Sequence, residues 1–282
     1  MCDTCGCNIT SGNRHLLLDM PKATTPVSVL STLLAHNDKQ AETNRARLDR
    51  QGILAVNLMS SPGSGKTALL EATIAQLKSR LRIAVIEGDL ETENDAARIR
   101  AQGVVAHQIT TGTACHLDAH LVEGALDQID LGQIDLLFIE NVGNLVCPAS
   151  FDLGHHLNVT LLSVTEGDDK PAKYPVMFRA ADLMLVTKSD LLPHLDDFSP
   201  QRAEQHLRAL ANPAPVLTLS SRKNQGMEVW LQWLQEQVVA HKSRVAQQET
   251  LKPRVQKEGR ALHQAAPAVR FRPVKPVHDH VD

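Results

Sequence analysis

The chain has 282 residues, 43% of them hydrophobic and 22% charged, which is long enough to bury a substantial core in one or two domains. Its formal net charge of −3 gives no overall nucleic-acid signature, and no apolar stretch approaches the length of a membrane span. Because the N-terminus has no signal-peptide pattern, we expect a cytoplasmic protein whose thiols are reduced.

The chain begins with a cysteine cluster, C-x-x-C-G-C, made by Cys2, Cys5 and Cys7. Three thiolates this close can surround one ion, and a main-chain or terminal nitrogen in the fourth position would make a square-planar site suited to Ni²⁺. Zn²⁺ is the competing ion, since thiolates bind it well, and a redox role is the other alternative. We expect residues 1–26 to be an N-terminal metal-binding segment and linker.

Residues 27–50 have the spacing of a helix, and from Gly52 onward short aliphatic segments alternate with helix-like ones. Aliphatic runs of this kind are typical of strands buried on both faces. The alternation predicts an α/β fold over residues 27–240, with a mainly parallel sheet flanked by helices on both faces, as in P-loop NTPases. The predicted strands are 53–59, 82–87, 104–109, 136–140, 159–164, 183–187 and 216–219. The predicted helices after residue 52 are 68–80, 92–102, 116–128, 200–210 and 227–239.

The segment from Ser60 to Thr67, S-S-P-G-S-G-K-T, lies between the first predicted strand and a predicted helix, which is the order a phosphate-binding loop requires. Its glycines let main-chain N–H groups point at phosphate oxygens. Lys66 would reach the β- and γ-phosphates, and the Thr67 hydroxyl is placed for Mg²⁺. Ser60 stands where the first glycine is usual. The predicted phosphate-binding residues are Gly63, Ser64, Gly65, Lys66, Thr67 and Ala68.

Glu140 ends a predicted strand, where P-loop enzymes place the acid that holds Mg²⁺ through water. The Gly143 N–H is expected to meet the γ-phosphate, and Asp89 is the candidate for a second metal-side or water-orienting carboxylate. Helix-capping or solvated carboxylates are the alternative for both acids. The predicted catalytic set is therefore Lys66, Asp89 and Glu140.

The run Thr187 to Asp190, T-K-S-D, follows another predicted strand at the point where GTP-binding proteins carry N-K-x-D. The Asp190 carboxylate would accept two hydrogen bonds from guanine, and adenine offers neither donor. The Lys188 stem can lie along the base, and Ser221 lies in the S-S-R run where GTPases place S-A-K. Thr187 replaces the usual Asn. We predict GTP rather than ATP as the nucleotide.

The remaining two cysteines form a second group with a histidine: Cys115 and His116 are predicted to begin a helix, and Cys147 follows the Glu140 loop. A metal bound there would respond to nucleotide state, because both ligands would act on one movable loop. His120, four residues after His116, is a possible helper. A buried thiol beside a surface histidine is the alternative, and His155-His156 is a weaker metal candidate.

Residues 241–282 hold nine Lys or Arg against four Asp or Glu, together with four prolines and no apolar periodicity. We predict a basic, disordered C-terminal tail, either simply solvated or acting as a docking arm for an acidic partner. His278 and His280 within it are expected to be solvated.

These segments together resemble the HypB family of GTPases, the hydrogenase nickel incorporation proteins, over about residues 28–240. The segments that carry the resemblance are N-L-M-S-S-P-G-S-G-K-T, E-G-D-L, C-H-L-D-A-H, I-E-N-V-G-N-L-V-C-P and G-D-D-K-P-A-K-Y-P. The resemblance implies a SIMIBI-class P-loop GTPase that forms a GTP-dependent homodimer. It also implies delivery of Ni²⁺ to the hydrogenase large subunit, with a small zinc-containing nickel chaperone as partner.

The resemblance also assigns residues by position. Cys2, Cys5 and Cys7 match a tight nickel site, and Cys115, His116 and Cys147 match a second site that binds Ni²⁺ or Zn²⁺ at the dimer interface. Lys66, Thr67, Asp89, Glu140, Lys188 and Asp190 match the nucleotide site, and Lys170 is assigned a phosphate contact.

The sequence thus predicts a GTP-hydrolysing nickel metallochaperone that works without nucleic acid or membrane. Its hydrolysis should be slow without a partner, since no arginine finger is identifiable. A urease-type nickel-insertion GTPase is the nearest alternative, but such chains carry Cys-Pro-His and here Pro148 is followed by Ala149. A nickel-storage protein would not need the Lys66-Thr67 pair, and a small-molecule kinase would need an acceptor pocket that the sequence does not indicate.

Overall fold

The computed structural model describes residues 26–89, 94–112 and 114–256, and side chains from residue 33 onward. The predicted N-terminal metal segment with Cys2, Cys5 and Cys7 lies outside the described residues. So does the chain after residue 256, with His278 and His280.

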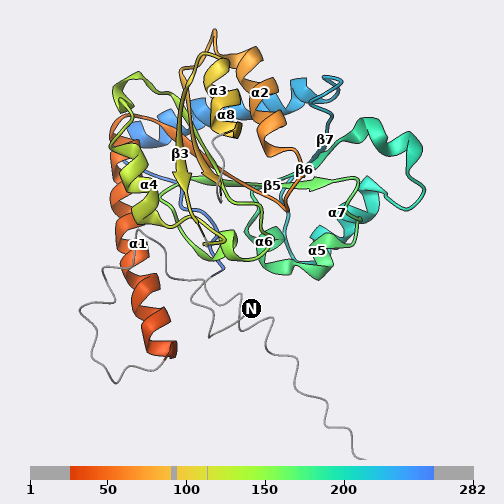
Figure 1. Ribbon diagram of the computed structural model, residues 1–282, viewed down its shortest axis with the longest axis horizontal. Coiled ribbons are helices and arrows are strands. Elements are labelled where there is room, and N and C mark those ends of the chain that lie inside the picture. Colours follow the sequence, from red (N-terminus) through yellow and green to blue (C-terminus); the bar gives the residue numbers. More distant parts are fainter. Residues whose placement is uncertain (1–25, 90–93, 113, 257–282) are drawn as a thin grey trace, which may run out of the picture.

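A seven-stranded, all-parallel sheet forms the centre of the described chain, in the order β3-β2-β4-β1-β5-β6-β7 (Figure 1). Each of the seven predicted strands is present, so the predicted fold class is confirmed. The strands are β1 Leu54–Met59, β2 Ile83–Asp89, β3 Val105–Thr110, β4 Leu136–Glu140, β5 Leu157–Ser163, β6 Leu183–Thr187 and β7 Val216–Thr218.

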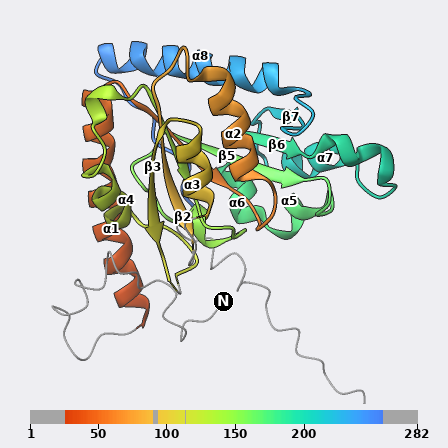
Figure 2. The same cartoon turned by 45° about the horizontal axis from the view of Figure 1, so that its top comes forward.

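Helices cover both faces of this sheet. One apolar cluster fills the space between the sheet and helices α2, α3 and α8. Two further clusters cover the opposite face, one beneath α1 and α4 and the other beneath α6 and α7. Both views show α1 beside α4 along one flank, and α2 beside α3 (Figures 1 and 2). The helices are α1 Pro26–Arg50, α2 Lys66–Leu77, α3 Asn94–Ala101, α4 Ala119–Leu126, α5 Lys170–Lys173, α6 Pro175–Ala180, α7 Pro200–Ala209 and α8 Met227–Ala246.

The central strand β1 shows why its sequence is almost entirely apolar. Leu54, Val56 and Leu58 pack in the cluster beneath α2 and α8, whereas Ala55 and Met59 face the other side. All six residues of the strand are buried, as expected for a strand covered by helices on both faces.

Several predicted element boundaries differ from the observed ones, and two of these differences affect the metal group and the C-terminal segment. Helix α4 begins at Ala119 and not at 116, because the Asp118 carboxylate accepts the Leu121 N–H at 2.8 Å and caps the helix. Cys115 and His116 therefore lie in the turn before α4. Helix α8 continues to Ala246, past the tail boundary predicted at 240, and the Gln256 N–H donates to the Ala149 carbonyl at 2.9 Å.

Two short helices, α5 and α6, were not predicted, and each has a proline in its first turn. Among the described residues, no helix combines the length and apolarity needed to cross a membrane.

Candidate nucleotide and metal site

The predicted phosphate-binding loop lies between β1 and α2 at the carboxyl edge of the sheet. Gly63 and Gly65 have φ values of 74° and 94°, a left-handed conformation that favours glycine, and Gly65 caps α2. A cavity of about 410 Å³ opens in front of this helix N-terminus. It brings together most of the predicted phosphate and metal residues: Gly63, Gly65, Lys66, Thr67, Ala68, Asp89, Glu140 and Gly143 all line it.

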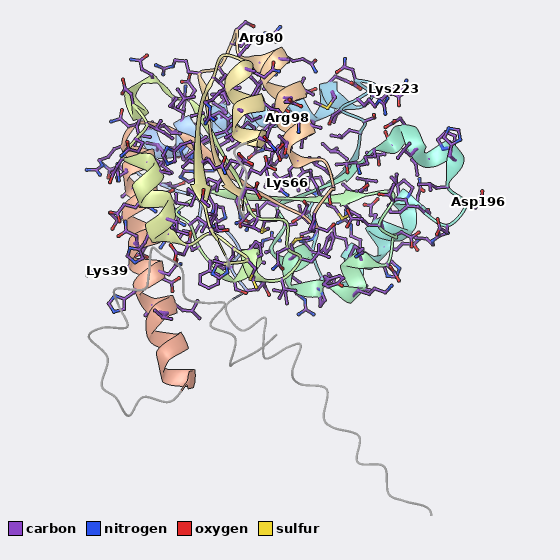
Figure 3. The ribbon with its side chains drawn as sticks, in the orientation of Figure 1. Lys39, Lys66, Arg80, Arg98, Asp196 and Lys223 are labelled. Carbon is purple, nitrogen blue, oxygen red and sulfur yellow. The ribbon has the colours of Figure 1, made fainter. Side chains whose placement is uncertain are left out.

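The centre of this cavity holds the lysine, hydroxyl and carboxylate expected of a nucleotide and Mg²⁺ site. The Thr67 hydroxyl donates to Glu140 Oε1 at 3.0 Å, and Lys66 Nζ lies 4.0 Å from the same oxygen. Lys66 and Arg98 of α3, both labelled in Figure 3, line this same cavity. The Ser60 hydroxyl accepts from Lys66 Nζ at 3.1 Å, so the serine that replaces glycine helps to position the lysine.

Glu87 also belongs to this site, although no sequence pattern predicted it. It lies opposite Glu140 in the β2–β4 pairing, it is buried, and it lines the same cavity. Burial, reinforced by the charge of Glu140, raises the pKa of Glu87 to about 8, and burial raises the pKa of Glu140 to about 7. The Oε2 atom of each carboxylate is buried without a hydrogen-bond partner. Two such carboxylates in the cavity that Thr67 also lines fit the hard, oxygen-only preference of Mg²⁺.

Glu166 was also missed, and it supports the phosphate-binding loop from the end of β5. Its carboxylate accepts hydrogen bonds from the Ser61 hydroxyl and, at 2.6 Å, from the Ser64 hydroxyl. The Ser163 N–H donates to the same carboxylate at 3.1 Å. This acid therefore holds the loop against the sheet, with no sequence signal beyond its place after a predicted strand.

A second cavity of about 360 Å³ continues from the first, since Gly65 and Ala68 line both. The predicted base-binding residues Lys188, Asp190 and Ser221 line it. The Ser220 hydroxyl donates to Asp190 Oδ1 at 2.5 Å, which fixes the carboxylate.

Thr187, which stands where GTP-binding proteins usually have Asn, also lines this cavity and has a structural role. Its hydroxyl donates to the Ser64 carbonyl at 2.8 Å, so it connects the end of β6 to the predicted phosphate-binding loop. Lys188 donates to the Gly63 carbonyl at 2.7 Å and makes a second tie to the same loop. Lys170 lines neither of these cavities, and its Nζ lies 5.0 Å from the centre of the Tyr174 ring.

The predicted second metal group is assembled in the structure. Cys115 Sγ lies 3.2 Å from Cys147 Sγ and 3.8 Å from His116 Nδ1, and the three ligand atoms lie within 4.8 Å of one another. His116 is fully buried and stacks on Phe151, with the ring centres 4.0 Å apart. Hydrogen bonds from Cys147 and then from His116 hold the pKa of the Cys115 thiol well below its usual range. This gives a thiolate–imidazole set suited to Ni²⁺ or Zn²⁺.

His120 is not in this group, because it lies on α4 beyond the capping Asp118, with its Nδ1 3.9 Å from Glu123.

A second cluster of possible metal ligands, Asp49, His156 and His241, serves the packing of the fold. Its ligand atoms also lie within 4.8 Å of one another. However, His156 Nδ1 accepts the Ala55 N–H at 2.9 Å, so the ring proton is on Nε2, which donates to Asp49 at 3.1 Å. A protonated nitrogen cannot bind a metal ion. The role of this cluster is instead to hold α1, the start of β5 and α8 together.

Comparison with known proteins agrees with this geometry. Residues 54–218 match the family model described as "CobW/HypB/UreG, nucleotide-binding domain". The chain is 55% identical over 205 residues to the hydrogenase maturation factor HypB of Azotobacter vinelandii, covering 73% of this chain and 67% of the relative. It is 46% identical over 205 residues to the hydrogenase/urease maturation factor HypB of Helicobacter hepaticus, covering 71% of this chain and 84% of the relative. The crystal structure of HypB from Helicobacter pylori in complex with nickel matches with a TM-score of 0.69 and 44% identity, over 73% of this chain and 96% of that one.

Proposed function

Because the chain belongs to the CobW/HypB/UreG family of nucleotide-binding proteins, we propose that it is a GTP-hydrolysing nickel metallochaperone acting in the maturation of nickel–iron hydrogenase. One observation carries the proposal: a Cys–His–Cys ligand set is built partly on the loop that leaves the nucleotide cavity. Cys147 lies on the chain segment that follows Glu140, and Glu140 lines that cavity.

Each residue of the nucleotide site has one task in this function. Lys66 and the main-chain N–H groups at the start of α2 bind the phosphates, and Asp190 accepts hydrogen bonds from guanine. Thr67, Glu140 and Glu87 supply the oxygens that would hold Mg²⁺, which neutralises phosphate charge when bound. Asp89, which also lines the cavity, is assigned to orienting the attacking water.

In the metal half of the proposal, Ni²⁺ is the cargo and not a resident cofactor. Cys115, His116 and Cys147 would bind it, with Zn²⁺ as a competitor, and Cys2, Cys5 and Cys7 would form the N-terminal site. The Helicobacter relative named as a hydrogenase/urease maturation factor supports a second candidate role, nickel delivery to urease.

Three partners remain proposals drawn from the family. They are a second copy of this chain in a GTP-dependent homodimer, a small zinc-containing nickel chaperone, and the hydrogenase large subunit that receives the ion. Both thiols of the Cys115–Cys147 pair must be reduced to bind metal, which fits the cytoplasmic location expected from the sequence.

GTP turnover tests the nucleotide half. Lys66→Ala should lower kcat/KM for GTP by ~10²-fold or more, because it removes a cation that stabilises charge on the phosphates. Lys78→Ala is the matched control, since Lys78 lies just past the other end of α2 and donates to the Gln102 carbonyl at 2.9 Å. Equal turnover by the two variants would overturn this assignment.

Ni²⁺ titration tests the metal half. Cys147→Ala should remove the binding equivalent that survives when Cys2, Cys5 and Cys7 are replaced by serine. Ser150→Ala, in the same short 3-10 turn as Cys147, should retain it. Unchanged Ni²⁺ binding in Cys147→Ala would contradict the assignment of this site.

A further inference from the structure

Leu117 connects the metal group to the wall of the nucleotide cavity. It follows His116 directly, and its main-chain N–H donates to Asn141 Oδ1 at 3.3 Å. Its side chain lies against Gly88, so closely that a Cβ on Gly88 would be 2.8 Å from Leu117 Cγ. Gly88 and Asn141 both line the 410 Å³ cavity. The residue beside a metal ligand is therefore in contact with two residues that the nucleotide would approach.

Asn141 is the polar member of this contact, and its side chain is held in one orientation. It follows Glu140 directly and is 1% exposed. Its Oδ1 also accepts the Val142 N–H at 3.0 Å, and its Nδ2 donates to Asn57 Oδ1 at 3.2 Å. Turning the amide over would leave buried donors and acceptors unpaired, so this side chain moves only together with its neighbours.

Asn57 extends the connection through the core. It lies in the central strand β1 and is fully buried, and its Nδ2 donates to Asn158 Oδ1 at 3.0 Å. A row of buried amides, Asn141–Asn57–Asn158, thus crosses an apolar sheet and orients the Asn141 amide so that its Oδ1 faces the Leu117 N–H.

We propose that Asn141 is a positioning residue that transmits nucleotide occupancy to the Cys115–His116–Cys147 group through the N–H of Leu117. This inference rests on the proposed function. Cys147 is attached to the 140–143 loop by the chain itself, and the Cys115–His116 half of the group is attached to it through Asn141. A shift of this loop caused by the terminal phosphate then moves both halves of the ligand set together.

The test measures the ratio of Ni²⁺ dissociation constants with GDP and with a non-hydrolysable GTP analogue, in the full chain carrying Cys2, Cys5 and Cys7 as serine. The wild-type ratio should differ from one by ~5- to 150-fold, the usual range of coupling between two sites. In Asn141→Ala it should fall to within ~2-fold of one when the ratio is measured at a saturating concentration of each nucleotide. Linkage requires Ni²⁺ to change the preference for the GTP analogue over GDP by the same factor in each protein.

Asn37→Ala is the matched control. Asn37 is a buried amide of α1 that accepts the Ala119 N–H at 2.8 Å, so it holds the other end of the same segment without lining the nucleotide cavity. A general loosening of the segment would lower the ratio in both variants, whereas the proposal requires its loss in Asn141→Ala alone. Should Asn141→Ala fail to fold, Asn57→Ala removes the bond that orients Asn141 and must lower the ratio in the same direction.

The outcomes separate the two proposals. A coupled wild type whose Asn141→Ala variant keeps the full ratio, or whose Asn37→Ala variant loses it equally, overturns the role of Asn141 alone. A wild-type ratio of one overturns both this role and nucleotide-controlled metal delivery.

Discussion

The choice of nucleotide depends on one carboxylate, and Asp190→Asn is the sharpest test of it. The Ser220 hydroxyl already binds Oδ1 at 2.5 Å, which leaves Oδ2 and the second lone pair of Oδ1 for the base. Guanine offers an N1–H and an exocyclic amine to these acceptors. Each hydrogen bond to a charged group contributes about 1.5–3 kcal/mol, and the amide would replace one acceptor with a donor that faces the amine.

Losing one such bond and leaving a donor unpaired should reduce the free energy of GTP binding by about 2–4 kcal/mol, which corresponds to a ~30- to 1,000-fold larger dissociation constant for GTP. Xanthosine triphosphate carries a carbonyl in place of the amine, so it should bind the variant better than GTP does. Competition titrations with GTP, ATP and xanthosine triphosphate measure all three affinities.

Asp196→Asn is the matched control for this prediction, because Asp196 is exposed at the far edge of the molecule (Figure 3) and should leave every affinity unchanged. If Asp190→Asn bound GTP as tightly as the wild type, or if the wild type bound ATP equally well, the assignment of the base cavity would be wrong.

Three further predictions follow from buried groups. Glu87→Gln should raise the Tm of the nucleotide-free protein at pH 8 and have no effect near pH 4.5. In the folded protein the Glu87 pKa is raised to about 8, so the carboxyl keeps a proton that the unfolded chain releases above ~4.5. The stability of the wild type therefore falls as the pH rises from ~4.5 to about 8, whereas the glutamine variant does not lose this stability. Cys147→Ala should move the pH midpoint of Cys115 alkylation upward, measured by iodoacetamide labelling and mass spectrometry, because the main hydrogen bond that lowers the Cys115 pKa is lost; an unchanged midpoint contradicts this. Trp230→Phe removes the indole donor to Thr73, 2.9 Å away in the core, and should lower the free energy of unfolding in urea by about 1–3 kcal/mol without changing GTP affinity.

The central strands of the sheet were predictable because they are buried on both faces, so that their sequences are aliphatic on consecutive residues. The phosphate-binding loop, Glu140 and Asp190 were predictable because each must follow a strand at the carboxyl edge. Their convergence on two connected cavities follows directly from that order.

The features of the site that the sequence did not predict depend on strand register and on side-chain contacts between segments that are distant in the chain. Glu87 joins the site only because β2 and β4 pair with Glu87 opposite Glu140, and no local pattern encodes that register. In the sequence, Asn141 was only one residue of a family motif. Its hydrogen bond from the Leu117 N–H exists because the fold places the turn before α4 beside the end of β4. Helix α4 begins later than predicted because Asp118 caps it, and the residues before Asp118 therefore lie outside the helix.

The central claim is that a nucleotide bound at the phosphate-binding loop changes the affinity of the Cys115–His116–Cys147 group for Ni²⁺, and that Ni²⁺ in turn changes the affinity for the nucleotide. The most direct test is calorimetric titration of Ni²⁺ into the wild-type chain when it is empty, loaded with GDP, or loaded with a non-hydrolysable GTP analogue and Mg²⁺. We predict that the Ni²⁺ affinity of the second site differs by at least ~5-fold between the diphosphate and triphosphate states. Identical affinity and stoichiometry in all three states would contradict the account.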